Sequence, residues 1–249
     1  MLKIRSDSNG YKETRIIFTR MRMMRYPTFL VFAMIMIFFI VSCSFIEGDE
    51  SLEKKCVIIV SGNEGYTQHE LDKASSFREY LLENCSIDDI IYLTDPSDPC
   101  SDGAANVSNI EKAFEWLRSE SGQMTEVMVY IFDHITMIAD EETFQFDDGN
   151  IEVDTIELCL EDVECLSMTV ILNGERSGLG GPILFDGCRD VICSMGPDQD
   201  MDPDLFNITR SLKDPSADLD GDGEVSFIEA YWNEVILLRG TGQDPVLYN

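Results

Sequence analysis

The sequence has 249 residues, of which 44% are hydrophobic and 10% aromatic. This composition can bury a sizeable core and excludes a wholly disordered chain. Acidic residues outnumber basic ones by 47 to 18, and the formal net charge is −29. Because such a surface repels phosphate backbones and attracts cations, the charge excludes nucleic-acid binding as the function.

The N-terminal region differs from the rest of the chain. Residues 1–43 are rich in Lys and Arg, and within them the run Thr28–Val41 contains no charged residue. A basic flank before an apolar run is typical of an export signal, with the basic side left in the cytoplasm. The run ends in Ile40–Cys43, which resembles the lipobox of bacterial and archaeal lipoproteins and implies lipidation of Cys43. The alternative is an uncleaved transmembrane helix that continues to Ile46. Both alternatives predict a protein at the cell membrane whose bulk is extracytoplasmic.

Residues 44–55 are polar and predict a tether, after which strands and helices alternate. Cys56–Val60 is a continuous apolar run of the kind that forms a buried parallel strand. Apolar residues from Ile110 to Leu117 repeat at helical spacing, with Ser108 as the predicted N-cap. In chain order, the predicted elements are strand 56–60, helix 71–81, strand 90–94, helix 110–117, strand 127–132, helix 156–163, strand 168–172 and strand 190–194.

This alternation predicts an α/β fold with a mostly parallel sheet between helices. We assign residues 56–212 to this domain and residues 213–249 to a C-terminal calcium-binding segment. In parallel sheets, functional groups gather at the C-terminal ends of the strands. The positions to inspect are therefore Ser61, Asp133–His134 and the loop after Leu172.

Seven cysteines follow Cys43, and an exported chain permits disulfides. Short separations in sequence favour three pairs and leave Cys56 buried and free, although sequence alone does not fix connectivity. The favoured pairs are Cys85 with Cys100, Cys159 with Cys165, and Cys188 with Cys193.

The segment Asp218–Glu229 matches the twelve-residue EF-hand loop at every informative position. Gly223 stands at the sharp turn, and Pro215 predicts that the preceding helix stops before the loop. A helix follows, which Gly240 is placed to end. We predict one bound Ca²⁺, with ligands from Asp218, Asp220, Asp222, Glu224, Ser226 and Glu229.

Three strand ends together resemble the legumain-type cysteine peptidases, which have the caspase-like fold. They are Ser61-Gly62 after the first strand, His134 after the third, and Ser177-Gly178 in the loop after the fourth. The likeness extends over roughly residues 55–249. It implies a caspase-like three-layer sandwich and, for an active member, a histidine base beside a cysteine nucleophile.

Two departures from the family pattern concern this chemistry. His134 occupies the position of the base, but Glu175 occupies the position of the nucleophilic cysteine, and an ionised carboxylate attacks amides poorly. Ile135 replaces a glycine that leaves room for the oxyanion. Cys165 precedes the fourth strand and Cys193 lies on the fifth, so neither is expected to substitute. We interpret His134 as an inherited base that can pair with Glu175.

These observations favour a non-catalytic, calcium-binding module at the cell surface that binds a protein or peptide. One alternative is an active cysteine endopeptidase with another nucleophile. A second is a hydrolase that uses Glu175 and His134 as an acid–base pair. Ser177 is a remaining candidate nucleophile, although no base is apparent beside it.

Overall fold

The computed structural model describes residues 52–61, 68–146, 148–199 and 205–249. The predicted export signal, Cys43 and most of the tether lie outside these residues. Residues 51–249 form one compact unit. Within the described ranges, no helix is both long and apolar enough to cross a membrane.

A six-stranded sheet forms the centre of this unit, in the order β2-β1-β3-β7-β8-β9. Its first five strands are parallel, and β9 runs antiparallel to β8. β1 begins at Glu53, so the tether is three residues shorter at its C-terminal end than predicted. The strands are β1 (Glu53–Val60), β2 (Asp89–Leu93), β3 (Thr125–Phe132), β7 (Ser167–Asn173), β8 (Asp190–Cys193) and β9 (Val246–Tyr248).

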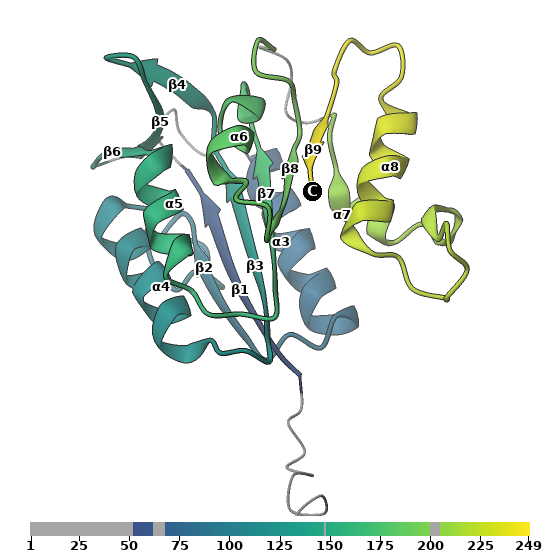
Figure 1. The fold of residues 1–249 in the computed structure, drawn as a ribbon, viewed down its shortest axis with the longest axis horizontal. Helices are drawn as coiled ribbons and strands as arrows, with labels where there is room; N and C mark the ends of the chain where they lie inside the picture. Colours follow the sequence, from purple (N-terminus) through teal and green to yellow (C-terminus); the bar gives the residue numbers. More distant parts are fainter. Residues whose placement is uncertain (1–51, 62–67, 147, 200–204) are drawn as a thin grey trace, which may run out of the picture. The chain divides into compact units, whose positions relative to one another are not determined.

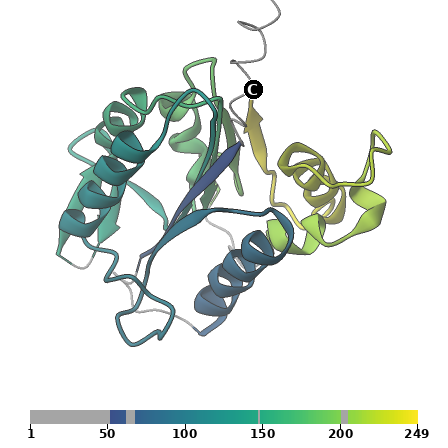
Figure 2. The same cartoon turned by 90° about the horizontal axis from the view of Figure 1, so that it is seen from below.

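The central residues of the parallel strands are apolar because both faces of the sheet are covered by helices. Val57 and Ile59 belong to one core, whereas Ile58 and Val60 belong to the other. Figures 1 and 2 show α4 and α3 on opposite faces. One face carries α4 (Val107–Glu120), α5 (Val153–Glu161) and α6 (Gly181–Leu184), and the other carries α3 (Gln68–Asn84), α7 (Ile208–Leu212) and α8 (Phe227–Leu237). The predicted α/β architecture with a mostly parallel sheet is confirmed.

A second sheet was not predicted. It consists of the antiparallel strands β4 (Ile135–Ile138), β5 (Glu141–Phe146) and β6 (Gly149–Glu152). Ala139 and Asp140 both have positive φ, as a two-residue hairpin between β4 and β5 requires. Phe144 and Phe146 pack into the core, so this small sheet extends the main domain beyond the end of β3.

The N-cap of α4 is Asn106 and not Ser108. The Asn106 side chain accepts a hydrogen bond from the amide of Asn109 at 2.9 Å, so the helix starts two residues earlier than an N-cap at Ser108 would give. Ser108 is an exposed residue of the first turn.

All seven cysteines in the described part of the chain are free, so the three favoured disulfides are wrong. Cys193 is completely buried on β8, whereas Cys188 is exposed. Separation in sequence alone does not fix which cysteines come together. Cys56 is buried and free, as predicted.

The C-terminal segment belongs to the same compact unit as the sheet. A 3-10 turn, Pro215–Ala217, precedes the predicted calcium loop, and α8 follows it. The chain then returns to the main sheet as β9 beside β8 (Figure 1).

Candidate functional site

The ends of β3 and β7 meet at the edge where the sequence predicted a site. Phe132 is paired with Asn173, and the amide of Asp133 donates to the carbonyl of Asn173 at 3.1 Å. Beyond them, the amide of Ile135 donates to the carbonyl of Glu175 at 3.0 Å. His134 and Glu175 therefore follow the ends of neighbouring strands, although the bond that joins their segments is between backbone atoms.

The turn after β7 is constrained by close packing. A Cβ on Gly174 would lie 1.9 Å from the carbonyl oxygen of Asp133, so no larger residue fits there without a backbone shift. Arg176 has φ of 56°, a left-handed conformation that is uncommon for a residue with a side chain. A Cβ on Gly178 would lie 2.7 Å from the nitrogen of Pro197. The chain thus makes a tight strand-to-helix turn with Glu175 between two constrained residues.

Asp133 is the buried carboxylate of this site. Its Oδ1 accepts from the amide of His134 at 2.8 Å and lies 3.3 Å from the ring Nδ1 of His134. Its Oδ2 accepts from the amide of Gln145 in β5 at 3.2 Å. Burial raises the pKa of Asp133 to about 6, against the opposing effect of these hydrogen bonds. The short sheet β4–β6 therefore helps to hold the histidine through the carboxylate next to it.

The structure offers no suitably placed nucleophile among Ser177, Cys165 and Cys193. Ser177 is completely buried, and its hydroxyl accepts from the amide of Met195 at 3.0 Å and lies 3.3 Å from the hydroxyl of Ser194. Burial raises the pKa of both Cys193 and Cys165, which disfavours the reactive thiolate. Ser61 follows β1, and its hydroxyl donates to the carbonyl of Gln145 at 2.8 Å.

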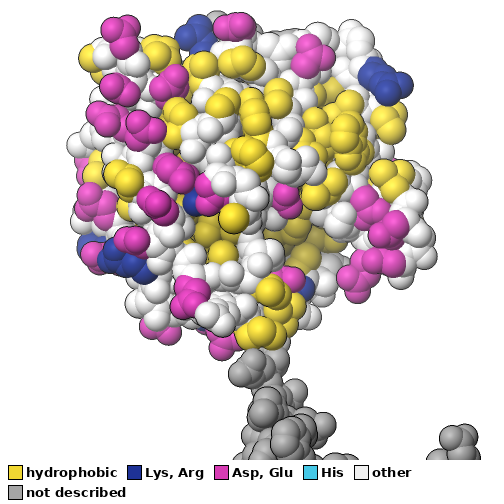
Figure 3. Space-filling view, viewed as in Figure 1, with side chains coloured by type: hydrophobic (Ala, Val, Ile, Leu, Met, Phe, Trp, Pro, Cys, Tyr) yellow, Lys and Arg dark blue, Asp and Glu magenta, His cyan; other side chains and the backbone are white. Residues whose placement is uncertain are grey.

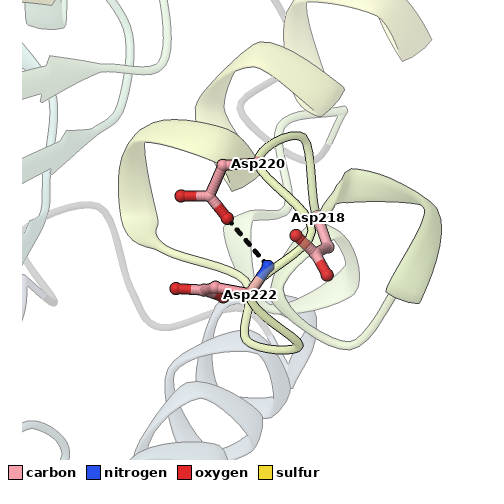
Figure 4. A group of neighbouring side chains, drawn as sticks. All are labelled: Asp218, Asp220 and Asp222. Carbon is pink, nitrogen blue, oxygen red and sulfur yellow. Dashed lines mark hydrogen bonds between the residues drawn. The ribbon is translucent and has the colours of Figure 1, made fainter.

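The predicted calcium loop brings three carboxylates together. One oxygen from each of Asp218, Asp220 and Asp222 lies within 4.8 Å of the others. Figure 4 shows the three side chains on one short loop, with the amide of Asp222 bonded to Asp220. Two oxygens that bind one Ca²⁺ at about 2.4 Å can be at most about 4.8 Å apart, so this spacing fits the ion. Gly221 and Gly223 both have positive φ, which the tight loop requires.

Glu229 lies across this loop. Its Oε1 accepts from the amides of Leu219 and Asp220, and its Oε2 accepts from the amide and hydroxyl of Ser226. Ser226 in turn caps α8, so the two residues form a capping box. These hydrogen bonds lower the pKa of Glu229 to about 2. The carboxylate is therefore ionised and positioned at the loop. To bind Ca²⁺, it would give up its hydrogen bonds to these backbone amides and coordinate the ion instead.

The helices on both sides of the loop are joined by a buried carboxylate that sequence reasoning missed. Glu234 of α8 is completely buried, and its Oε2 lies 2.8 Å from the guanidinium of Arg210. The same carboxylate accepts from the hydroxyl of Ser211 and from the amide of Asn207. α7 ends at Leu212, ahead of Pro215, as predicted. An acidic residue in an apolar stretch was the only available signal for this link.

A groove of about 780 Å³ separates the calcium loop from the sheet. Its walls come from the end of α3 and from the loop, and its floor comes from the first residues of β1, β3 and β7. Charged groups of both signs line it, including Lys54, Glu126, Lys213 and Glu224.

Comparison with solved structures supports the fold. The crystal structure of the Drosophila initiator caspase Dronc matches with a TM-score of 0.53 and 13% identity, over 79% of this chain and 79% of that one. Protein GSU0716 from Geobacter sulfurreducens matches with a TM-score of 0.57 and 12% identity, over 79% of this chain and 92% of that one. The chain therefore has a caspase-like fold. No family model and no curated protein matches the sequence.

Proposed function

We propose that this protein is a calcium-binding module with a non-catalytic, peptidase-like domain, held at the outer side of a cell membrane. The observation that carries the proposal is the loop Asp218–Glu229, in which three carboxylates converge and a fourth lies across the loop. An extracytoplasmic setting supplies Ca²⁺ at the concentrations that weak EF-hand sites need.

The absence of catalysis is supported by the replaced residues at the strand ends. Glu175 stands where a legumain-type peptidase has its cysteine. The amide of Ile135, the residue in place of the family's glycine, already donates to the carbonyl of Glu175 and is not free to bind an oxyanion. The legumain-type assignment within the caspase-like fold is part of this proposal and depends on the motif around His134.

Membrane attachment through Cys43 or through the apolar run Thr28–Val41 is supported by the sequence alone. The ligand that we propose is a protein or peptide. The groove beside the calcium loop, with charges of both signs along its walls, is the concave surface that we propose for it.

Calcium titration tests the central claim. Saturating Ca²⁺ should raise the melting temperature, and an excess of about 100-fold over Kd would add about 2.7 kcal/mol to the free energy of unfolding. Glu229→Gln should remove most of this gain, because position twelve supplies both carboxylate oxygens. Glu224→Gln is the matched control, since position seven binds through its backbone carbonyl and the gain should persist. An equal calcium-induced rise in melting temperature in both variants contradicts the proposal. A calorimetric titration of the wild type that shows no heat of calcium binding contradicts it as well.

The loss of peptidase activity has a separate test. We expect no cleavage of Asn-, Asp- or Arg-directed peptides and no labelling by thiol-reactive peptidase inhibitors. Turnover that is abolished by alkylation of the cysteines would reveal a nucleophile that we have misplaced. Turnover that survives alkylation and is lost in both Glu175→Gln and His134→Gln would favour the acid–base hydrolase.

A further inference from the structure

The groove beside the calcium loop has the loop itself as one wall. The loop contributes Asp218 and residues 223–227, and residues 85–87 after α3 lie on the opposite wall. The two walls are packed together at their base, because the ring of Phe227 lies against that of Phe77 on α3, with centroids 6.3 Å apart. A change in the conformation of the loop therefore changes the groove.

The floor of the groove is held by the main sheet. Lys54, Glu126 and Ser167 form one row across β1, β3 and β7, since Lys54 is paired with Glu126 and Glu126 with Ser167. The ammonium of Lys54 also lies 3.3 Å from the carboxylate of Glu126. Because the register fixes this row, the loop is the part of the groove on which an ion in the loop acts directly.

Glu224 connects the ion to the groove. At position seven of the loop, its backbone carbonyl is a predicted Ca²⁺ ligand, whereas its exposed side chain lines the groove. Burial raises the pKa of the Cys85 thiol on the opposite wall, and the carboxylate of Glu224 adds to this effect, so the two side chains are close to one another. Since the carbonyl and the side chain share one Cα, turning the carbonyl toward an ion also moves the side chain.

Ser226 makes a second connection. It lines the groove, and its amide and hydroxyl both donate to the carboxylate of Glu229. Figure 3 shows acidic side chains gathered over this loop, on the right of the molecule. Without an ion these charges repel one another, and hydrogen bonds between exposed groups hold the wall. With Ca²⁺ bound, the ion replaces the bonds from Glu229 to Ser226 and fixes the same segment through several ligands.

We infer that Ca²⁺ orders the loop wall of this groove, so that the protein or peptide ligand binds more tightly to the calcium-loaded protein. The inference rests on the proposed calcium site and adds the regulation of the proposed groove. A wall that is already ordered spares the ligand the entropic cost of ordering it. By linkage, the ligand then strengthens Ca²⁺ binding by the same factor, which is roughly 5- to 150-fold for typical couplings between sites.

A polarity-sensitive dye tethered to Cys85 tests this inference in the full chain, extracted in detergent. Cys85 is half-buried on the groove, and the other partly or fully exposed cysteines of the described residues are replaced by Ser. These are Cys100, Cys159, Cys165 and Cys188. Mass spectrometry confirms that the dye is on Cys85. We expect Ca²⁺ to shift the emission to shorter wavelength, as the ordered wall excludes water from the dye, with the same midpoint as the heat of calcium binding.

Two variants provide the controls. A dye on Cys100, in a variant that keeps this residue and replaces Cys85, reports a site beyond the C-terminal end of β2 and outside the groove, and its emission should not respond to Ca²⁺. Glu229→Gln in the variant labelled at Cys85 should abolish the shift or move its midpoint to much higher Ca²⁺ concentration.

Hydrogen exchange of the unmodified full chain makes the same comparison without any cysteine replacement. Because the loop wall packs against α3, Ca²⁺ should slow exchange several-fold in the peptide over residues 82–88, where the amides of Cys85 and Asp88 are hydrogen-bonded. Exchange in α4 (Val107–Glu120), which covers the other face of the sheet, should not change.

The outcomes distinguish this inference from the calcium site on which it rests. A heat of calcium binding without a shift to shorter wavelength, and without slower exchange over residues 82–88, overturns the ordering of the groove and leaves the calcium site standing. No heat of calcium binding overturns both. An equal shift from the dye on Cys100, or a shift that is unchanged in Glu229→Gln, also overturns the ordering.

Discussion

The calcium loop and the strand-end site differ in how their residues are brought together. The loop takes its ligands from twelve consecutive residues, Asp218–Glu229, and hydrogen bonds within that segment shape it. The strand-end site joins segments about 40 residues apart through the register of β3 and β7. All ligands of the proposed Ca²⁺ site lie in one segment, whereas the strand-end site combines His134 with Glu175, the residue at the position that we propose for a lost nucleophile.

The backbone around the strand-end site is fixed by packing, independently of any chemistry at Glu175. Gly174 and Gly178 are constrained by contacts with the backbone of neighbouring segments, and Ser177 is buried in hydrogen bonds with the segment after β8. These residues are needed for packing whether or not a nucleophile stands between them. The glycines and the serine of this turn are therefore evidence of the fold and not of activity.

The largest effect should come from the link that holds the calcium loop to the domain. Glu234→Ala removes a buried carboxylate and leaves Arg210, Ser211 and the amide of Asn207 without their common acceptor. Loss of one partner of a buried pair costs about 3–5 kcal/mol, and we expect the lower end because Arg210 is half exposed. Urea unfolding measures this cost.

Glu120→Ala, at an exposed position on α4, is the matched control and should change stability by less than about 0.5 kcal/mol. A calcium-induced gain that survives unchanged in Glu234→Ala would show that the loop folds independently of the link between α7 and α8.

A second substitution tests the claim that packing alone preserves the strand-end turn. Gly174→Ala places a methyl group against the carbonyl of Asp133, and overpacking of this kind costs about 1–3 kcal/mol. Gly122→Ala is the control, since a Cβ there meets nothing within 4 Å. Thermal unfolding that gives equal effects for the two variants would mean that β3 and β7 are not as close as the structure has them.

The sequence predicted the parts of the fold that are set by local pattern. Continuous apolar runs identify β1, β3 and β7 to within three residues at each end, because both faces of these strands are buried. The convergence of Asp218, Asp220 and Asp222 could be predicted because these residues belong to one contiguous segment. The hairpin β4–β5 was missed because its turn, Ala139-Asp140, contains no glycine. β9 is only three residues long and exists through its pairing with β8, which no local pattern reports.

The candidate site was predicted only in part, because contacts between segments that are distant in sequence leave no local pattern. The positions of His134 and Glu175 at adjacent strand ends follow from the parallel topology. The burial of Asp133 and its bond to Gln145 depend on the small sheet that was missed. Glu234 was not recognised because its partners lie on α7, more than 20 residues earlier in the chain.

The smallest expected effect contrasts two carboxylates. Glu229 is exposed and its pKa is lowered to about 2 by hydrogen bonds, whereas Asp133 is buried and its pKa is raised to about 6 by desolvation. In the unfolded chain, Asp133 titrates near its ordinary value of about 3.9, so between about pH 4 and pH 6 the unfolded state loses this proton before the folded state does. The contribution of Asp133 therefore makes the protein less stable as the pH rises through this window, and the loss is constant above it.

A shift of two pKa units corresponds to about 3 kcal/mol, and relaxation around the charge should reduce the observed change to about 1–2 kcal/mol. Urea unfolding of the wild type and of Asp133→Asn at pH 4, 5, 6 and 7 should show the stability of the wild type falling relative to the variant by that amount, since the other titrating groups contribute equally to both. A difference that does not change with pH would mean that Asp133 is solvated in the folded protein, and the segment that carries His134 would then not be held as the structure indicates.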